Sequence, residues 1–340
     1  GKTTVTVLVT EMLERSGVVT IAAGNTDVPL VDVLDRGLDI AVVEASSFRL
    51  QLTETFAPRV GTWLNLAEDH LDWHPSLADY IAAKARLWAN QGPDDVAVAN
   101  ADDGVVAAEA KRTRATLQWF SLEGPVDGWW WDRDGGCLVG PGGPFVPVSR
   151  LARHLPHDLA NALAATATAV AAGASLEVCA DVLAGFQGLA HRVALVAEAG
   201  GVCWYDDSKA TTPASVLAAV GGFSSAVLIA GGRNKGLDLG VLASAAPPVH
   251  AVVAIGDAAP EVVRAFAGTG VPVVTASSMG EAVASAARLA RPGDAVLLSP
   301  GCASFDWYRD YTARGDDFAR AVLDQTGAEP APALPRGGSH

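Results

Sequence analysis

The sequence predicts an α/β protein of two domains, a larger domain built on a central parallel sheet of the P-loop type and a smaller, Rossmann-like α/β domain after it. Three observations lead to this prediction. Short β-branched runs alternate with helical patterns over most of the 340 residues, which is typical of βαβ units. The alternation lapses once, in a stretch rich in Trp, Gly and Pro, and then restarts. The chain also opens on half of a phosphate-binding loop.

The first four residues, Gly1 to Thr4, match the second half of the motif G-x-x-x-x-G-K-[ST]. In such a loop backbone N–H groups surround the phosphates, Lys2 reaches the β- and γ-phosphates, and the Thr3 hydroxyl ligates Mg²⁺. An amphipathic helix is expected to follow and to present its N-terminus to the anion, because apolar residues recur at helical spacing: Val5, Leu8, Val9, Met12 and Leu13. A match this short also fits an ordinary helix start, so a nucleotide site needs support from the rest of the chain.

The remaining elements of the first domain are placed by apolar runs and turn residues. Strands are expected at residues 18–22, 40–44, 60–66, 96–100 and 116–120. The stretch 124–147, which contains Trp129-Trp130-Trp131, is interpreted as a β-hairpin-like insertion whose tryptophans pack against the sheet edge. Helices over residues 159–172 and 176–185 complete the domain.

The second domain begins where the alternation restarts. Its strands are expected at residues 202–205, 226–231, 249–256, 271–274 and 295–299, with helices between them. The predicted boundary lies near Gly188, so the domains span residues 1–188 and 189–327. Residues 328–340 are rich in Pro, Gly and Ala and are predicted to be a disordered tail.

Composition narrows the class of protein. The excess of 38 Asp and Glu over 24 Lys and Arg gives a net charge of −14, which argues against nucleic acid or an anionic membrane as a partner. No apolar run reaches the roughly 18 residues needed to span a bilayer, so a soluble protein is expected. The cysteines are far apart and favour reduced thiols of a cytoplasmic protein over disulfides or a zinc site: Cys137, Cys179, Cys203 and Cys302.

Metal-capable side chains follow two strands of the first domain. Glu44 ends an apolar strand, at the edge where open α/β sheets bind ligands, although a helix-capping role is the alternative. The segment Glu68-Asp69-His70-Leu71-Asp72 follows the next strand, and His70 there is equally compatible with a metal ligand and with a turn residue. Lys84 lies on a helix that begins near Leu77, on its inner side near Tyr80.

Three polar turns follow strands of the second domain. They cover residues 205–213, 231–236 and 299–306, and they offer acids, lysines and hydroxyls. Because the carboxyl ends of parallel strands share one edge of a sheet, we expect the turns to line one site. Thr211 or Thr212 also suits the N-cap of the helix that starts at Pro213.

In this order the motifs resemble the Mur ligase family from Gly1 to about Leu323. The segments that carry the resemblance are Gly1–Thr4, Gly24-Asn25, Glu44–Phe48, Asn65–Asp72, Ala83-Lys84, His157 with Asn161–Ala164, His191-Arg192, Asp207–Thr211, Gly231–Gly236 and Leu298–Phe305. The narrowest is Asp207-Ser-Lys-Ala-Thr211, which favours the members that add D-glutamate. Asp158 and Thr212 depart from the family pattern, where Asn is common at both positions.

The resemblance implies ATP-driven amide formation between UDP-N-acetylmuramoyl-L-alanine and D-glutamate, two small-molecule substrates, in peptidoglycan precursor synthesis by a cytoplasmic monomer. By this likeness Lys2, Glu44, His70 and Lys84 are catalytic, and Thr3, Glu44, His70 and a carbamylated Lys84 hold Mg²⁺. ATP is assigned to Gly1, Lys2, Thr3, Thr4, Asn161, Arg192 and Asp207. The substrates are assigned to Asn25, Lys209, Thr211, Lys235, Ser299 and the Phe305 backbone.

The family pattern also includes an N-terminal UDP-binding domain and the first half of the phosphate loop, neither of which is in this sequence. We therefore expect the chain to be a fragment with negligible ligase activity by itself. Two alternatives stay open at this point. One is a related ligase for another amino acid, including the folylpolyglutamate type, and the other is a nucleotide-binding remnant without catalysis.

Overall fold

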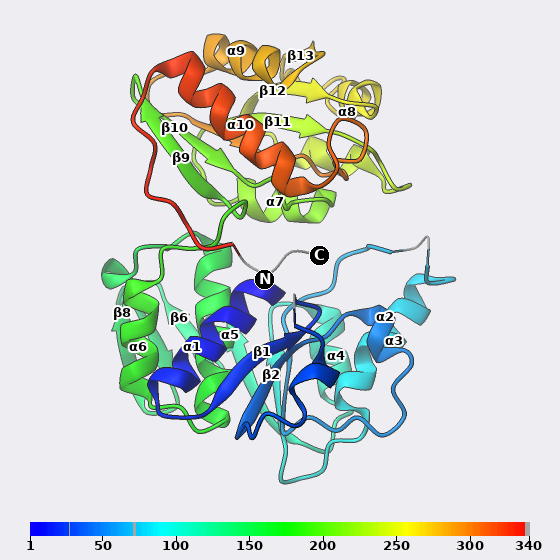
Figure 1. Ribbon diagram of the computed structural model, residues 1–340, viewed down its shortest axis with the longest axis vertical. Helices are drawn as coiled ribbons and strands as arrows, with labels where there is room; N and C mark the ends of the chain where they lie inside the picture. The colour runs from blue at the N-terminus through cyan, green and yellow to red at the C-terminus, as the bar shows by residue number, and fades with distance from the viewer. Residues whose placement is uncertain (27, 71–72, 337–340) are drawn as a thin grey trace. The chain divides into compact units, whose positions relative to one another are not determined.

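The computed structural model describes residues 1–26, 28–70 and 73–336, and the chain divides into two compact units (Figure 1). Unit 1 begins at Gly1 and ends at Gln187, and unit 2 runs from Gly188 to Arg336. Both units are α/β, as predicted. None of the helices in the described part of the chain combines the length and apolar character that crossing a membrane requires.

Unit 1 contains a two-stranded and a six-stranded sheet. Parallel β1 (Thr20–Gly24) and β2 (Ile40–Glu44) form the first, with the 3₁₀ helix η1 (Leu30–Val33) between them. The second has the order β3 (Val60–Trp63), β4 (Val96–Asn100), β5 (Thr116–Ser121), β6 (Gly128–Asp132), β7 (Cys137–Gly140) and β8 (Gly143–Pro147). Its first four strands are parallel, and β7 and β8 continue it antiparallel.

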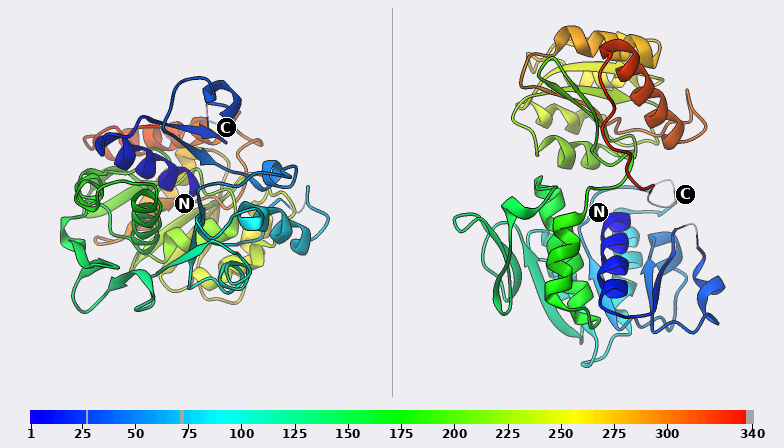
Figure 2. Two further views of the ribbon diagram at one scale, coloured as in Figure 1. Left: turned by 90° about the horizontal axis from the view of Figure 1, so that it is seen from below. Right: turned by 60° about the vertical axis from the view of Figure 1, so that its left-hand side comes forward.

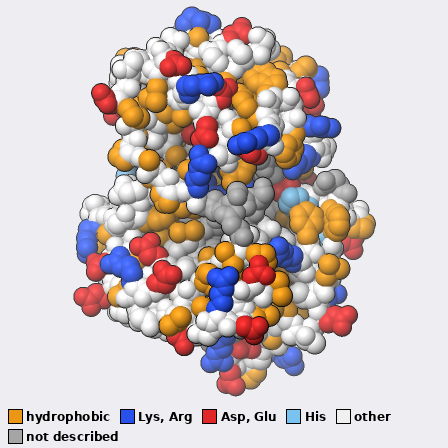
Figure 3. All heavy atoms as spheres, viewed as in Figure 1, with side chains coloured by type: hydrophobic (Ala, Val, Ile, Leu, Met, Phe, Trp, Pro, Cys, Tyr) orange, Lys and Arg blue, Asp and Glu red, His pale blue; other side chains and the backbone are white. Residues whose placement is uncertain are grey.

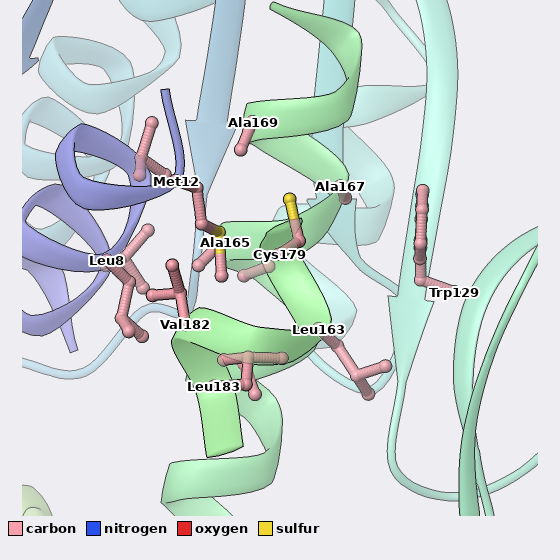
Figure 4. Close-up of a cluster of buried hydrophobic side chains, with 14 of the residues drawn as sticks. Leu8, Met12, Trp129, Leu163, Ala165, Ala167, Ala169, Cys179, Val182 and Leu183 are labelled. Atoms are coloured by element: carbon pink, nitrogen blue, oxygen red, sulfur yellow. The ribbon is translucent and has the colours of Figure 1, made fainter. Parts of the chain in front are cut away.

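The helices of unit 1 pack against its strands and against one another. Helix α1 (Lys2–Arg15) packs against β1 and β2 on one side and against α5 (Pro156–Ala171) and α6 (Leu176–Gly185) on the other (Figure 2). Figure 4 shows Leu8 of α1 beside Val182 of α6 and Met12 of α1 beside Ala165 of α5. The short α2 (Ser47–Leu50) packs against α3 (Leu77–Ala89), whereas α4 (Gly104–Ala110) packs on β4 and η2 (Val148–Arg150) follows β8.

The tryptophan stretch belongs to the sheet itself, so the prediction that it packs against the sheet edge was wrong. Trp129, Trp130 and Trp131 form the middle of β6, between β5 and β7. Trp129 is buried next to α5 (Figure 4), and its indole N–H donates to Gln118 Oε1 at 3.0 Å. Alternation in a strand sends Trp129 and Trp131 to the core shared with α5. The stretch therefore adds β6 to the parallel part of the sheet, and β7 and β8 continue the sheet after it.

Unit 2 is a single six-stranded sheet. Its order is β13 (Val273–Ala276), β12 (Val249–Ile255), β11 (Ala226–Gly231), β14 (Ala295–Leu298), β10 (Val202–Asp206) and β9 (Ala194–Ala199). All neighbours are parallel except β9, an edge strand that the sequence analysis missed and that pairs antiparallel with β10. The carboxyl ends of β10, β11 and β14 consequently lie at the same edge.

Helices cover both faces of the unit 2 sheet. On one face α9 (Met279–Leu289) and α10 (Tyr311–Thr326) enclose a core with Trp204 and Phe318. On the other lie α7 (Pro213–Val220), η3 (Leu239–Ala245) and α8 (Ala259–Ala265) (Figure 1). Acidic and basic side chains are interspersed over the surface shown in Figure 3.

Residues 328–336, which were predicted to be disordered, run as an extended segment after α10. Ala331 N–H donates to Val196 O of β9 at 2.8 Å, and Ala190 N–H donates to Pro335 O at 2.9 Å. The segment therefore lies along the free edge of β9. Residues 337–340 of the predicted tail lie outside the described residues.

Candidate functional site

The first site element is the N-terminus of α1 in unit 1. The first helical hydrogen bond runs from Val5 N–H to Gly1 O at 2.9 Å, so the N–H groups of Lys2, Thr3 and Thr4 precede it. Such first-turn groups have no acceptor within their helix and, with the helix dipole, favour an anion. A Cβ on Gly1 would come within 2.5 Å of Asn161 Oδ1, which places Asn161 of α5 directly beside this turn.

Glu44 ends β2 and is buried, with 4% of the residue exposed. Its backbone carbonyl accepts from Asn25 N–H at 2.7 Å, because β1 and β2 pair in register from Thr20 to Gly24. A Cβ on Gly24 would meet that carbonyl at 2.6 Å, and the φ of +100° at Gly24 is one that glycine tolerates best. The strand pairing thus brings two predicted site residues, Asn25 and Glu44, together.

His70 follows β3 and has an unusual backbone conformation, with φ of +57°. Its backbone N–H donates to Asp69 Oδ1 at 2.8 Å, and its Nε2 lies 3.2 Å from Asp69 Oδ2. The imidazole packs on Phe48 of α2, with 4.6 Å between ring centroids. A non-glycine residue at positive φ is held there by its surroundings. Asp72 of the predicted metal-capable segment lies outside the described residues.

Lys84 lies on α3 with its ammonium over the Tyr80 ring, 4.7 Å from the centroid. Burial, and next the charge of Lys2, lower the pKa of the Lys84 amine to about 8, while Asp69 acts in the opposite direction. Lys2, Lys84 and Asp69 are therefore within electrostatic reach of one another. The lowered pKa raises the share of the amine that is neutral and nucleophilic at neutral pH.

The donor set of this region suits Mg²⁺. Among the described residues, no group of three or more His, Cys, Asp or Glu side chains forms a closed metal cluster. Mg²⁺ does not need one, because it keeps several waters and binds one or two carboxylates together with substrate phosphates. The buried Glu44 carboxylate and the buried Thr3 hydroxyl are oxygen donors of that kind.

In unit 2 the three predicted turns meet at one sheet edge. Gly301 N–H donates to Ala210 O at 2.8 Å, which ties the third turn to the first. Gly231 N–H donates to Pro300 O at 2.8 Å, and Arg233 and Ala303 exchange two backbone hydrogen bonds of 2.8 and 3.0 Å. These bonds tie the third turn to the second as well.

Asp207 is the most perturbed acid of this edge. It is 7% exposed and accepts from Ser299 Oγ at 2.7 Å and from Val193 N–H at 3.3 Å. Burial raises its pKa to about 7; the hydrogen bond from Ser299 and the charge of Arg192 partly oppose this rise. Ser299 itself is fully buried, so its hydroxyl is committed to Asp207.

Lys209 and two residues of α10 form the centre of the edge. The Lys209 ammonium lies 3.9 Å from the centroid of the Tyr311 ring. Arg314 is 1% exposed and spans two turns, donating to Ser208 Oγ at 2.9 Å, to Ser208 O at 2.8 Å and to Cys302 O at 3.1 Å. Lys235 and Phe305 are exposed, whereas Thr211 is half-buried. Thr212, not Thr211, caps α7 through Ser215 N–H.

Comparison with known proteins identifies the family. Residues 1–169 match the Mur ligase middle domain, and residues 191–302 match the Mur ligase glutamate ligase domain. A UDP-N-acetylmuramoylalanine–D-glutamate ligase of Shouchella clausii (strain KSM-K16) is 42% identical over 321 residues, which are 94% of this chain and 71% of that protein. The chain belongs to the Mur ligase family. A ligase of the same name from Frankia casuarinae is also 42% identical, over 96% of this chain and 71% of that protein.

Solved Mur ligases share the fold. Crystal structure I of MurF from Acinetobacter baumannii matches with a TM-score of 0.71 and 20% identity over 95% of this chain and 74% of that one. MurF of Thermotoga maritima in complex with ADP matches with a TM-score of 0.70 and 17% identity, over 96% of this chain and 78% of that one. The resemblance and the fold class predicted from the sequence are therefore confirmed.

Sequence reasoning did not single out four residues of these two regions: Asp69, His74, Tyr311 and Arg314. Asp69 was only one acid in a cluster, and its contact with the His70 imidazole depends on the turn conformation. Tyr311 and Arg314 lie on the first turns of α10, one helical turn apart, facing the sheet edge. An arginine among the apolar positions of α10, next to Phe318 and Val322, was a signal that could have identified a buried cation.

Proposed function

We propose that this Mur ligase uses ATP and Mg²⁺ to join the amine of D-glutamate to the carboxyl group of UDP-N-acetylmuramoyl-L-alanine. The observation that carries the proposal is the union of the three unit 2 turns at one edge, with Lys209 and Lys235 on different turns. Two separate cationic contacts suit the two carboxylates of a dicarboxylate amino acid. The name shared by relatives at 42% identity over most of the chain supports the same substrate.

On the ATP side, the first turn of α1 would receive the phosphates, with Lys2 offsetting charge on the transferring group. Asn161, beside Gly1, would contact the nucleotide, together with Arg192 and Asp207 of unit 2. Thr3 and Glu44 would hold one Mg²⁺, and His70 with a carbamylated Lys84 a second. Bound Mg²⁺ supplies neutralisation of the charge on the β- and γ-phosphates.

The partly neutral Lys84 amine supports carbamylation, because only the unprotonated amine adds to CO₂. In the adduct, a negatively charged carbamate replaces the positively charged ammonium of Lys84 near Lys2. Its formation can be observed as a new carbonyl signal when the protein is supplied with ¹³C-bicarbonate, and a Lys84→Arg variant should lack that signal. A spectrum that is the same for both proteins would remove the carbamate from the proposal.

The reaction would proceed in two steps. The substrate carboxylate attacks the γ-phosphorus of ATP, which gives an acyl phosphate and ADP. The amine of D-glutamate then attacks the acyl carbon through a tetrahedral intermediate, phosphate leaves, and the amine proton passes to solvent. Asn25, beside Glu44, would orient the muramoyl-alanine end. Lys209, Thr211, Lys235 and the Phe305 backbone would hold the two D-glutamate carboxylates, and Ser299 would act through Asp207.

The decisive experiment measures phosphate release by the full-length protein with UDP-N-acetylmuramoyl-L-alanine, ATP and a series of amino acids. We expect D-glutamate to be preferred over L-glutamate and D-aspartate, with release lost when ATP or Mg²⁺ is withheld. Preference for another amino acid would indicate a different ligase of the family. ATP binding without turnover would indicate a remnant. We also propose that the enzyme acts on small-molecule substrates in the cytoplasm as a monomer, and sedimentation can test the monomeric state.

A further inference from the structure

A continuous series of ring contacts connects Lys84 to His70 in unit 1. The Lys84 ammonium lies over Tyr80, and the Tyr80 ring packs on His74 with 5.2 Å between centroids. His74 stacks on Phe48 at 5.9 Å with an interplanar angle of 14°, and Phe48 packs on His70 at 4.6 Å. His74 is the middle member of this series. It therefore contacts both Phe48 on α2 and Tyr80 on α3.

His74 is fixed in place by hydrogen bonds as well as by packing. It is 2% exposed, and its Nε2 lies 3.0 Å from Ser47 Oγ. Ser47, itself 4% exposed, opens α2 only three residues after Glu44. The His74 backbone N–H donates to His70 O at 2.9 Å. One buried residue thus connects the segment that carries Glu44, the turn that carries His70 and the helix that carries Lys84.

If position 74 only had to fill space in the core, burying a polar imidazole there would cost free energy that an apolar side chain would not. Burying an imidazole without a partner costs on the order of 1 to 3 kcal/mol, whereas a phenylalanine or leucine would fill the space at no such cost. What the imidazole adds is a fixed orientation of the ring, because its hydrogen bond to Ser47 fixes the ring plane on which Phe48 and Tyr80 pack. Groups of this kind, one layer behind a reactive side chain, set its orientation.

We propose that His74 is a positioning residue that fixes the His70 imidazole and the Lys84 side chain relative to one another through Phe48 and Tyr80. The inference rests on the proposed function, in which His70 and Lys84 act at one site. In this role His74 touches neither substrate nor nucleotide. Its contribution is geometric, and it should be visible in the protein without ligands.

Two substitutions separate the contributions of the ring and of the hydrogen bond. His74→Phe keeps an aromatic ring and loses the bond to Ser47, whereas His74→Gln can keep the bond and loses the ring. Each should shift the ¹H–¹³C imidazole resonances of His70 in the nucleotide-free and metal-free protein, because the ring current of Phe48 at 4.6 Å depends on its orientation. We expect kcat to fall about 10- to 100-fold, with the KM for the amino acid unchanged within about twofold.

Ser47→Ala tests whether the hydrogen bond between His74 and Ser47 is what fixes the position of His70. If the hydrogen bond carries the effect, Ser47→Ala should move the His70 resonances in the same direction as His74→Phe. The double variant should then be no worse than His74→Phe alone, since both changes remove one interaction. Additive effects would mean that the two residues act independently and would overturn the proposed route.

Gln91→Ala provides a matched control. Gln91 is fully buried in the same unit, just beyond α3, and its amide donates to Pro58 O at 2.8 Å and to Val96 O at 3.0 Å. This variant should lose stability while leaving the His70 resonances unchanged. If His74→Phe and His74→Gln also lowered only stability and left His70 unmoved, the positioning role would be wrong. The spectra require no substrate, so a failure of the proposed function would appear separately, as the wrong amino acid preference.

Discussion

Asp207→Asn tests whether a buried carboxylate at the unit 2 edge makes the stability of the protein depend on pH. Burial raises the pKa of Asp207 from 3.8 to about 7. A carboxyl group with a raised pKa stays protonated in the folded state while it ionises in the unfolded state. Unfolding free energy is therefore lost as the pH rises from about 4 to about 7, and the loss is complete above that range. Asparagine does not titrate, so the variant lacks this loss.

The size of the effect follows from the pKa. The difference between 3.8 and about 7, at about 1.4 kcal/mol per pKa unit, corresponds to an upper limit of about 4 kcal/mol. Asparagine can accept from Val193 N–H with its oxygen and donate to Ser299 Oγ with its nitrogen, but it gives up the attraction of Arg192. We therefore expect the unfolding free energy of the variant, relative to wild type, to rise by about 1 to 3 kcal/mol between pH 4.5 and pH 8.

The assay is urea unfolding at several pH values, followed by hydrogen exchange of the fully buried β11 amides, which report on unit 2 alone. Ser299→Ala is the matched variant, and it should behave in the opposite way. Its loss should be larger at pH 8 than at pH 4.5, because a hydroxyl donates most strongly to an ionised carboxylate. A stability difference for Asp207→Asn that stays constant across this range, or an Asp207 carboxyl carbon titrating near pH 4, would refute the reasoning.

Substitutions at Arg314, Gly315 and Asp294 test the packing of unit 2. Arg314→Met should lower the unfolding free energy by about 3 to 5 kcal/mol in urea titrations, because the carbonyls of Ser208 and Cys302 lose a buried donor, and Arg314→Lys should recover only part of it. Gly315→Ala would push a methyl group into the His191 ring and to 2.5 Å from Asp206 Oδ2 and should cost about 1 to 3 kcal/mol, while Gly280→Ala in the open first turn of α9 should be neutral or stabilising in the same urea titrations. Asp294→Asn should cost about 2 to 4 kcal/mol at pH 7. Burial raises the Asp294 pKa, but hydrogen bonds from Ser225, the Arg291 N–H and His250 outweigh it and leave the pKa lowered, so this stabilisation should disappear as the pH falls below about 4.

The alternation of apolar runs was sufficient to predict most of the strands. Strands β2, β4 and β11 have the bounds that the sequence predicts for them, because each contains a short apolar run; β11 is buried throughout, as expected of a parallel strand that is apolar on both faces. Strand β9 was missed because Ala194–Ala199 is short and mixes Glu with Ala, so its period is ambiguous. The signal for it was the turn, since Gly200-Gly201 has φ of +59° and +76°, as a tight hairpin requires.

The site could be predicted in part for a similar physical reason. Residues at strand ends, such as Glu44 and Asp207, were found because parallel topology alone brings strand ends together. The contacts of His70 with Asp69 and of Lys209 with Tyr311 were not found. They depend on a positive φ in one case and on where a helix begins in the other. Neither property is visible in the pattern of apolar residues.

The extended segment along β9 has a consequence for the behaviour of the protein at high concentration. A sheet edge with unpaired backbone groups is a template on which a second copy of the chain can add a strand. Here the hydrogen bond from Ala331 N–H to Val196 O occupies part of that edge, and the prolines around it cannot donate to a further strand. The same short segment, which carries no helix or strand of its own, thereby leaves less of the β9 edge open to a second copy of the chain.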